Sequence, residues 1–399
     1  MIAFGYVLLA LLFAHVGFQA TAYAKGSGNV RSSFPQAMAA TESPVNEFGG
    51  TPPRAAMIVP LTGDAPGMRE ALKSLLDQDY PNLEAWFVTK DEADPATPLI
   101  RELIQEYGHA RHILSGPAQT CGQKNHALLT VVQAIGDTAD ILVFCDSTHI
   151  AHPSLVRDLL RPIINGETVL TSGYHRIVPQ DTSLGTLGML LSTQTIHLLQ
   201  GFKSLNQPWG GAMAVSRKTF EEYDVAGVWS TNIVDDFSMG PHLLTKGIRC
   251  TGVSRACLTT PLKGKSIGAW SDWWMRQIYY LKFCMPLTWV AVSGLYILFI
   301  APVLFAPLLL LGWALGWWGL LPGLGGAAYY LVLLGLALWC RSLVAERIPL
   351  LPWLKGYLAY FPVSSVSYFR TWFSSTMGWR GIKYRVGWGG RVKEIIRES

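Results

Sequence analysis

The stretch ILVFCD, residues 141–146, consists of five apolar residues followed directly by a carboxylate. Short, continuous apolar runs are typical of strands that are buried on both faces, as in parallel sheets covered by helices. In open sheets of this kind, ligands bind outside the carboxyl ends of the strands. The stretch therefore predicts a strand of a parallel sheet that presents Asp146 to a ligand.

The chain before this stretch alternates short apolar runs with amphipathic segments. The apolar runs that predict strands lie at 55–60, 84–89 and 112–114. The segments with helical spacing lie at 68–76, 98–107 and 124–135. Such an alternation predicts a parallel sheet with helices on both faces. The pattern becomes less regular over 168–260, and we place the whole α/β domain at residues 55–280.

Two long segments contain no Asp, Glu, Lys or Arg, namely 1–24 and 286–340. A bilayer core needs about 20 apolar residues per helix. The first segment can therefore supply one membrane-spanning helix and the second can supply two. We predict an N-terminal anchor over 1–24, a Gly/Ser/Pro-rich linker over 25–54, and two transmembrane helices within 281–342.

The first apolar segment allows two interpretations. Ala22-Tyr23-Ala24 resembles the cleavage site of a signal peptide, which would make this a secreted protein. An uncleaved anchor is favoured because no Lys or Arg precedes the run, whereas Lys25 and Arg31 follow it. The positive-inside rule then places Met1 outside and the α/β domain in the cytosol.

The segment 341–399 is strongly basic, with ten Lys or Arg against three Glu. We predict that 343–399 forms interfacial helices, over the proline-interrupted run 348–373, and then a basic cytosolic tail that faces anionic headgroups. Nucleic-acid binding is the alternative for a basic tail. It is disfavoured because this tail follows apolar spans and is rich in aromatic residues. We expect a multi-pass integral protein of the inner or plasma membrane that binds no nucleic acid.

Residue types that often bind metals show no strong metal-binding pattern. The six cysteines are scattered without a C-x-x-C pair, which argues against a zinc site or a disulfide framework and fits a reducing compartment. His149 and His152 follow Asp146 closely, and we interpret both as surface or supporting residues rather than as ligands.

Acidic residues occur after the predicted strands in a distinctive order. KDEADPA (90–96) follows the second strand, CDST (145–148) follows the fourth, and VDDFSM (234–239) comes later in the domain. One or two carboxylates together with diphosphate oxygens can hold a divalent cation. A positioned carboxylate can also act as a general base.

The ordered set of motifs resembles the family-2-type inverting glycosyltransferases, and specifically their ceramide glucosyltransferase-like branch, family 21. The resemblance covers about Ala55 to the C-terminus. It rests on Pro60, LLDQDYP (75–81), KDEADPA (90–96), GQKNHAL (122–128), CDS (145–147), WRGIKYR (379–385) and Gly389-Gly390. It implies a GT-A domain, a Rossmann-like α/β fold that binds a nucleotide sugar.

The resemblance also implies a role for individual residues. Asp91 would contact the base or ribose of a UDP-sugar, with Lys124 also on the donor side. Asp146 would hold Mg²⁺ or Mn²⁺ against the diphosphate. Asp236 would be the general base, with Asp235 beside it. The expected reaction moves a hexose to the hydroxyl of a lipid acceptor, such as ceramide, diacylglycerol or a hopanoid.

One motif departs from the family pattern. The (Q/R)-x-x-R-W motif of the family corresponds to WWMRQ (273–277), in which only Arg276 remains, expected near the diphosphate and acceptor. Two alternatives stay open at this point. One is a polysaccharide synthase, which would be expected to have more spans and an intact motif. The other is a binding or scaffold protein on a degenerate transferase domain. The sequence leaves the sugar, the lipid and the oligomeric state open.

Overall fold

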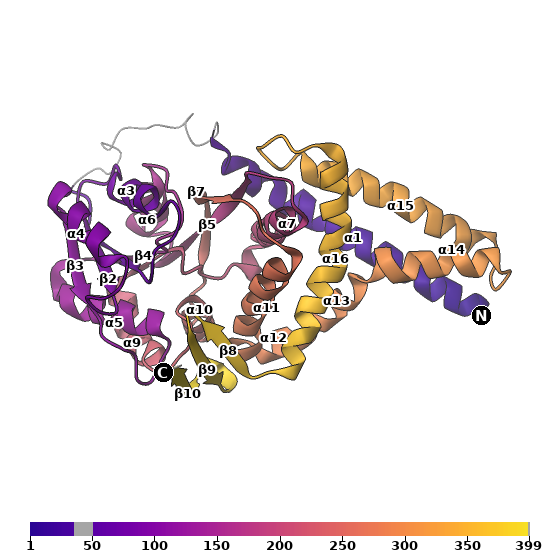
Figure 1. The fold of residues 1–399 in the computed structure, drawn as a ribbon. Coiled ribbons are helices and arrows are strands. Elements are labelled where there is room, and N and C mark those ends of the chain that lie inside the picture. The colour runs from indigo at the N-terminus through magenta and orange to yellow at the C-terminus, as the bar shows by residue number, and fades with distance from the viewer. Residues whose placement is uncertain (36–50, 398–399) are drawn as a thin grey trace.

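The computed structural model describes residues 1–35 and 51–397, and a seven-stranded sheet organises its α/β domain (Figure 1). The strand order is β3-β2-β1-β4-β6-β5-β7. The strands are β1 (Ala55–Pro60), β2 (Leu83–Thr89), β3 (Ala110–Leu114), β4 (Ile141–Cys145), β5 (Leu170–Pro179), β6 (Ala212–Ser216) and β7 (Thr251–Leu262). The four strands expected from apolar runs are therefore confirmed.

Most neighbouring strands of this sheet run parallel. The pairs β3-β2, β2-β1, β1-β4 and β5-β7 are parallel, and only β6 is antiparallel to its neighbours β4 and β5. Ile58 lies opposite Phe144 in the register of β1 and β4. The carboxyl ends of these two central strands therefore meet at one edge of the sheet.

Helices cover both faces, as the alternation along the chain predicts. Along β4, Val143 and Cys145 face one core, whereas Leu142 and Phe144 face the other. The first core is closed by α3 (Met68–Leu76), α4 (Thr97–Glu106) and α6 (Leu155–Ile164). The second is closed by α5 (Gln123–Ile135), α8 (Arg217–Glu222), α9 (Val225–Trp229) and α10 (Asp236–Thr245). Because each large apolar side chain contributes about 1.5–3 kcal/mol when fully buried, β4 is stabilised from both sides.

Three helical segments are long and apolar enough to cross a membrane. They are α1 (Ile2–Ser32), the segment Pro286–Ala314, and α15 (Leu320–Arg341). The second is divided into α12 (Pro286–Ala291), α13 (Ser293–Leu298), a π-helical turn (Ala301–Phe305) and α14 (Ala306–Ala314). Helix α1 continues past the expected boundary at Ala24, so the first part of the predicted linker is helical. Its later part, 36–50, lies outside the described residues.

Contacts with the α/β domain explain why α1 continues through residues of low helix propensity. A Cβ on Gly26 would lie 2.2 Å from the carbonyl oxygen of Leu198. Only glycine therefore permits this approach of α1 to α7 (Leu184–Leu199). Val30, one turn further on, is also buried in the core that α1 shares with α7. Tertiary packing outweighs the weak intrinsic preference of this segment.

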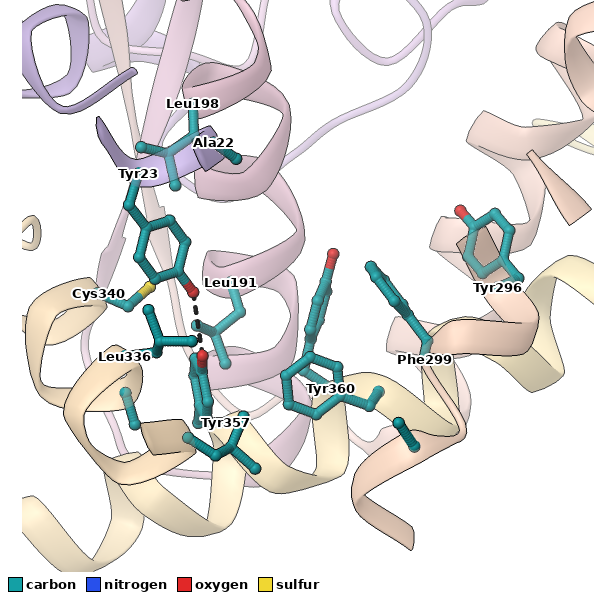
Figure 2. Close-up of a cluster of buried hydrophobic side chains, with 14 of the residues drawn as sticks. Ala22, Tyr23, Leu191, Leu198, Tyr296, Phe299, Leu336, Cys340, Tyr357 and Tyr360 are labelled. Atoms are coloured by element: carbon teal, nitrogen blue, oxygen red, sulfur yellow. Dashed lines mark hydrogen bonds between the residues drawn. The ribbon is translucent and has the colours of Figure 1, made fainter. Parts of the chain in front are cut away.

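A single apolar core joins the candidate membrane helices to the α/β domain. Figure 2 shows part of it, where Tyr23 of α1 lies between Leu198 of α7 and Cys340 of α15. The Tyr23 hydroxyl is 3.1 Å from the hydroxyl of Tyr357, on α16 (Leu350–Arg370). The same core includes Trp270 of α11 (Ile267–Cys284). The N-terminal helix is thus packed into the molecule rather than attached by a tether.

The run 348–373 forms one long helix, α16, instead of the series of helices that its prolines suggest. Pro352 lies in the first turn, where a missing N–H is tolerated. Pro362 lies inside the helix. Trp353, Tyr357 and Phe361 are buried on the side that packs against the domain. This aromatic face compensates for the hydrogen bond that Pro362 cannot make.

The basic segment after α16 folds into a second, antiparallel sheet. Its strands are β8 (Thr376–Trp379), β9 (Ile382–Val386) and β10 (Val392–Arg397), in the order β10-β9-β8. Met377, Tyr384 and Val386 are buried, whereas Lys383 and Arg385 alternate with them and are exposed. Figure 1 shows this sheet next to α10 and α11. The segment expected as a basic tail is therefore folded: its alternate apolar residues pack on the domain, whereas Lys383 and Arg385 point outward.

Candidate active site

A cavity of about 790 Å³ opens at the carboxyl ends of β1 and β4. One end is polar and is lined by Lys90, Lys124, Asp146, Asp235 and Asp236. The opposite walls come from the helices near the candidate membrane segment, and the residues there are mostly apolar: Ile196, Leu199, Ile278, Leu281, Met285, Thr288 and Tyr296. The cavity therefore connects a cluster of charged groups with the membrane helices.

Lys124 is the centre of the charged cluster. Its Nζ lies 2.9 Å from Asp146 Oδ1 and 3.0 Å from Asp235 Oδ2, and it donates a hydrogen bond to the carbonyl of Gly210. Burial alone would lower the pKa of Lys124, but the neighbouring carboxylates of Asp146, Asp235 and Asp236 outweigh it and raise this pKa above its usual value. Lys124 therefore stays charged and holds two carboxylates, from β4 and from α10, close together.

Gly210 lies against this cluster and requires the absence of a side chain. A Cβ at this position would lie 2.3 Å from Asp235 Oδ2 and 2.7 Å from Lys124 Nζ. The backbone N–H of Gly210 also donates to Asp236 Oδ2 at 2.8 Å. The Trp-Gly-Gly loop at 209–211 is therefore a direct part of the site, whereas its sequence alone also fitted an ordinary tight turn.

Asp236 is the buried carboxylate of the site. It is the first residue of α10, and its Oδ1 accepts a hydrogen bond from the N–H of Phe237. Burial raises the pKa of Asp236 to about 7, and the adjacent Asp235 carboxylate adds to this, while Lys124 and the two N–H groups oppose it. A carboxylate whose pKa lies near neutral pH is suited to accept a proton from a hydroxyl.

Asp235 is held from the backbone side as well as by Lys124. Its carbonyl accepts a hydrogen bond from the indole N–H of Trp229 at 2.9 Å, and its carboxylate is only 2% exposed. The loop before it is held by Asn125, which donates to the carbonyl of Asn232. The sequence order KN at 124–125 thus serves two purposes: Lys124 pairs with the carboxylates, and Asn125 positions the loop that carries them.

Arg276 is brought to the same cavity by α11. Its side chain lines the cavity, and it makes no hydrogen bond or ion pair with the residues that the structure describes. The flanking residues Trp273 and Gln277 also line the cavity. The altered motif at 273–277 therefore still contributes an unpaired guanidinium to the site.

The structure does not bring Asp91 into the cavity wall. Among the described residues, the lining includes the neighbouring Lys90 but not Asp91. The Asp91 carboxylate pairs with Lys90 at 3.0 Å and accepts a hydrogen bond from the N–H of Ala93. Asp94 of the same motif is buried and accepts hydrogen bonds from Gly63 and Ala96. In KDEADPA, the acidic residues therefore shape the loop, and Lys90 is the residue that reaches the cavity.

A histidine and tryptophan cluster next to Asp146 went unrecognised in the sequence. His149 and His175 each place Nδ1 within hydrogen-bond distance of the Thr260 hydroxyl, at 2.8 and 2.7 Å. His175 stacks on Trp209, with ring centroids 4.7 Å apart. Burial lowers the pKa of both histidines. His149, predicted to be a surface or supporting residue, lines the cavity in a neutral form, whereas His152 bonds Ser154 at the start of α6.

A divalent cation is compatible with the residues around Asp146. The Asp146 side chain is 34% exposed, toward the cavity. The described residues contain no group of three or more His, Cys, Asp or Glu arranged as a complete metal site. Mg²⁺ typically takes one or two carboxylates and completes its shell with substrate phosphates and water. A single exposed carboxylate in a cavity of this size fits that requirement.

The C-terminal sheet contributes to the site, which the sequence pattern did not predict. Met377, Trp379, Arg380 and Tyr384 line the cavity. The Tyr384 hydroxyl accepts a hydrogen bond from the N–H of Gln123, next to Lys124 in the chain. The sheet also shares an apolar core with Ile233 and Val234, just before Asp235. The only available signal was the alternation in IKYRV (382–386), which is typical of a half-buried strand.

Comparisons with known proteins identify the family and the fold. The model of glycosyl transferase family 21 matches residues 15–392. The mannosyltransferase PcManGT from Pyrobaculum calidifontis, solved in complex with GDP-Man and Mn²⁺, superposes with a TM-score of 0.54 at 14% identity, over 92% of this chain and 99% of that chain. Glucosyl-3-phosphoglycerate synthase from Mycobacterium tuberculosis, at 18% identity, covers 61% of this chain and 84% of that chain with a TM-score of 0.37. No curated protein sequence matches significantly.

The likeness to PcManGT shows the fold, and the family model shows the family. The mostly parallel sheet and the likeness to PcManGT establish the expected GT-A fold. The family model extends over nearly the whole chain, including α1 from His15 onward and the C-terminal sheet. The chain belongs to glycosyl transferase family 21, whose members transfer a sugar from a nucleotide sugar.

Proposed function

We propose that this protein is a membrane-bound inverting glycosyltransferase that moves a hexose from a UDP-sugar to the hydroxyl of a lipid. One observation carries the proposal: a single cavity contains the Lys124 cluster at one end and residues of a candidate membrane span at the other. Thr288 and Tyr296 line this cavity and belong to the span Pro286–Ala314. An acceptor that enters from the bilayer can therefore place its headgroup near Asp236 while its chains remain in an apolar environment.

In the proposed reaction, Asp236 is the general base. Its carboxylate takes the proton from the acceptor hydroxyl, and the hydroxyl oxygen attacks the anomeric carbon as the UDP leaves. The raised pKa of Asp236, about 7, supports this role because the carboxylate can both hold and release a proton near neutral pH. The Arg276 guanidinium stabilises the negative charge that develops on the diphosphate. Asp235 keeps Lys124 in place beside it.

Asp146 is the residue that would hold Mg²⁺ or Mn²⁺. When bound there, such a cation supplies positive charge to the diphosphate of the leaving group. His149 supports Asp146 from the cavity wall, with Nε2 3.9 Å from Asp146 Oδ2. The donor end further includes Pro60, Leu61 and Thr62 at the end of β1, and Lys90 after β2. We assign the contact with the base or ribose to this group rather than to Asp91.

We further propose that α1, the segment Pro286–Ala314 and α15 cross the membrane and that the catalytic domain is cytosolic. The buried position of Leu8, Leu12 and Val30 of α1 in the core shared with α7 supports an uncleaved anchor. Helix α16 packs against α11, so both helices lie on the same side of the membrane. The two crossings between them, by the segment Pro286–Ala314 and by α15, would return the chain to that side.

The experiment that tests this proposal uses the full-length protein in detergent. It is incubated with several radiolabelled UDP-sugars and a total lipid extract, and the lipid phase is then separated by chromatography. We expect a labelled glycolipid with the wild type and none with Asp236→Asn, which should still bind UDP. Asp272→Asn is the matched control, since Asp272 is an exposed carboxylate that pairs with Arg370. Full turnover by Asp236→Asn would refute the assignment of the base.

Stability provides an independent readout for the same variant. Asp236 binds its proton more tightly in the folded protein than in the unfolded chain, because its pKa is raised from 3.8 to about 7. Its ionisation therefore destabilises the fold progressively as the pH rises from about 4 to about 7. Asp236→Asn should then melt at a higher temperature than the wild type above pH 7, and the difference should shrink at low pH.

A further inference from the structure

The hairpin between β8 and β9 holds an arginine in an unusual backbone conformation. Trp379 pairs with Ile382, so Arg380 and Gly381 form a two-residue loop. Their φ angles are +48° and +77°. Two left-handed residues in a two-residue hairpin loop are typical of a type I′ turn, whose first position favours Asn, Asp or Gly. Arginine at this position is strained, because its Cβ approaches the backbone.

Only one other described residue that is not glycine has a positive φ, namely Asp224. Asp224 has a local reason for this conformation, since its carboxylate accepts a hydrogen bond from the N–H of Gly227 at the start of α9. The Arg380 side chain has no such compensation: its guanidinium makes no hydrogen bond or ion pair with the residues that the structure describes. Strain of this kind, held in place by the surrounding structure, is characteristic of functional sites.

The position of Arg380 points to the function that it serves. Arg380 lines the cavity together with Trp379 and Tyr384 of the same hairpin. The hairpin is fixed against the charged cluster, because Tyr384 accepts a hydrogen bond from the N–H of Gln123 at 3.2 Å. The N–H of Ile233 also donates to the carbonyl of Gly390, at the other end of the sheet. Arg380 is therefore held at the cavity wall by a rigid support.

The charges of the cavity show what Arg380 can bind. Lys124 is paired with Asp146 and Asp235, and Lys90 is paired with Asp91. The cations of the cavity wall without an anionic partner in the described chain are Arg276 and Arg380. A guanidinium matches the geometry of phosphate oxygens through two parallel hydrogen bonds. Two unpaired guanidinium groups in one cavity therefore favour a ligand with more than one negative charge.

We infer that Arg380 binds the diphosphate of the nucleotide-sugar donor, as a second guanidinium in addition to Arg276. The inference rests on the proposed function for the identity of the donor. It assigns the C-terminal sheet a direct part in donor binding: the sheet closes the cavity over the diphosphate and carries its own cation there. The left-handed turn is the means by which a short hairpin places Arg380 at the cavity wall.

The test measures UDP affinity by titration calorimetry on the full-length protein in detergent, without added lipid. Arg380→Ala should weaken UDP binding by about tenfold to a hundredfold, because it removes charge-assisted hydrogen bonds to phosphate. Binding of uridine, which has no phosphate, should be the same in the variant and the wild type. Arg380→Lys should recover only part of the affinity, since an ammonium cannot make the paired contact.

Two further variants separate binding from structure. Arg385→Ala removes the same charge from the outer face of the hairpin, where Arg385 pairs with Glu394, and it should leave UDP affinity unchanged. Arg380→Gly removes the strain of the turn, so it should melt at or above the temperature of the wild type while binding UDP as weakly as Arg380→Ala. A lower melting temperature for Arg380→Gly would show that the arginine has a structural role and would overturn the inference.

The remaining outcomes also decide between the two proposals. Equal UDP affinity for Arg380→Ala and the wild type overturns the assignment of Arg380. This is also the result expected if the arginine binds a lipid phosphate instead of the donor. A wild type that binds neither UDP nor GDP overturns this inference together with the nucleotide-sugar donor. A wild type that binds UDP but labels no lipid refutes the proposed acceptor alone, and the Arg380 comparison then stands on its own result.

Discussion

The two ends of the cavity are built in different ways. At the polar end, Lys124 is held by two carboxylates and Asp236 by two backbone N–H groups, while Arg276 and Arg380 have no anionic partner within the described chain. At the other end, the wall consists mostly of apolar side chains on α7, α11 and the candidate span. The difference indicates that the polar end is preorganised for one kind of ligand, whereas the apolar end selects mainly by size and shape.

The largest effect is expected at the polar end. Lys124→Met leaves Asp235 buried without a cation, and breaking a buried pair in this way costs about 3–5 kcal/mol. We expect loss of UDP binding and a marked fall in the melting temperature. Lys73→Met is the control, since Lys73 forms an exposed pair with Glu106, and its loss should change stability by less than about 1 kcal/mol. A Lys124→Met variant as stable as the control would break the contrast between the ends.

The pH dependence of activity tests the preorganisation of Asp236. The base must be ionised, and its pKa in the free protein is about 7. The value of kcat/KM should therefore fall about tenfold per pH unit below pH 7 and level off above it. The measurement requires a check by circular dichroism that the protein remains folded at the lowest pH. A rate that stays constant down to pH 5 would contradict a raised pKa at this position.

The smallest effect is expected at the apolar end. Met285→Trp enlarges a side chain in the cavity wall without touching the charged cluster. A misfit in an apolar pocket costs about 1–3 kcal/mol, so transfer to lipid should fall by about tenfold. UDP affinity should be unchanged. Leu287→Trp, at an 85% exposed position two residues further along in α12, should leave transfer intact. Weaker UDP binding by Met285→Trp would show that the two ends are not independent.

Much of the polar end could be predicted from the sequence because its elements are local. The run 141–145 is apolar throughout, which is the pattern expected of a strand buried on both faces. The position of Asp146 at the end of this strand therefore followed from the sequence. Asp235 and Asp236 both line the cavity because they share the start of α10. The cavity wall includes Lys90 rather than Asp91, because a carboxylate after a strand can turn back to bind its own loop. Nothing in KDEADPA distinguishes Asp91 from Lys90 as the residue that reaches the cavity.

The C-terminal sheet could not be placed from the sequence. Its positive charge favoured a position at the membrane surface. Its alternating apolar residues are too few to show which part of the protein the sheet packs against. The contact between Gln123 and Tyr384 joins residues 261 positions apart, and such a contact depends on the whole fold. The family resemblance of WRGIKYR showed that the segment belongs to the family, but it did not indicate that the segment forms a wall of the active site.

The polar side chains of α1 have a consequence for how the protein is made. His15 bonds Tyr329, 314 positions later, and Gln19 bonds Tyr357, 338 positions later. In the proposed topology, α1 leaves the ribosome and inserts long before either partner has been synthesised. An unpaired polar side chain in a bilayer is costly. Until their partners are made, His15 and Gln19 must therefore bond to water, lipid headgroups or an insertion factor. Biogenesis of the enzyme is then complete only when α15 and α16 arrive to replace them.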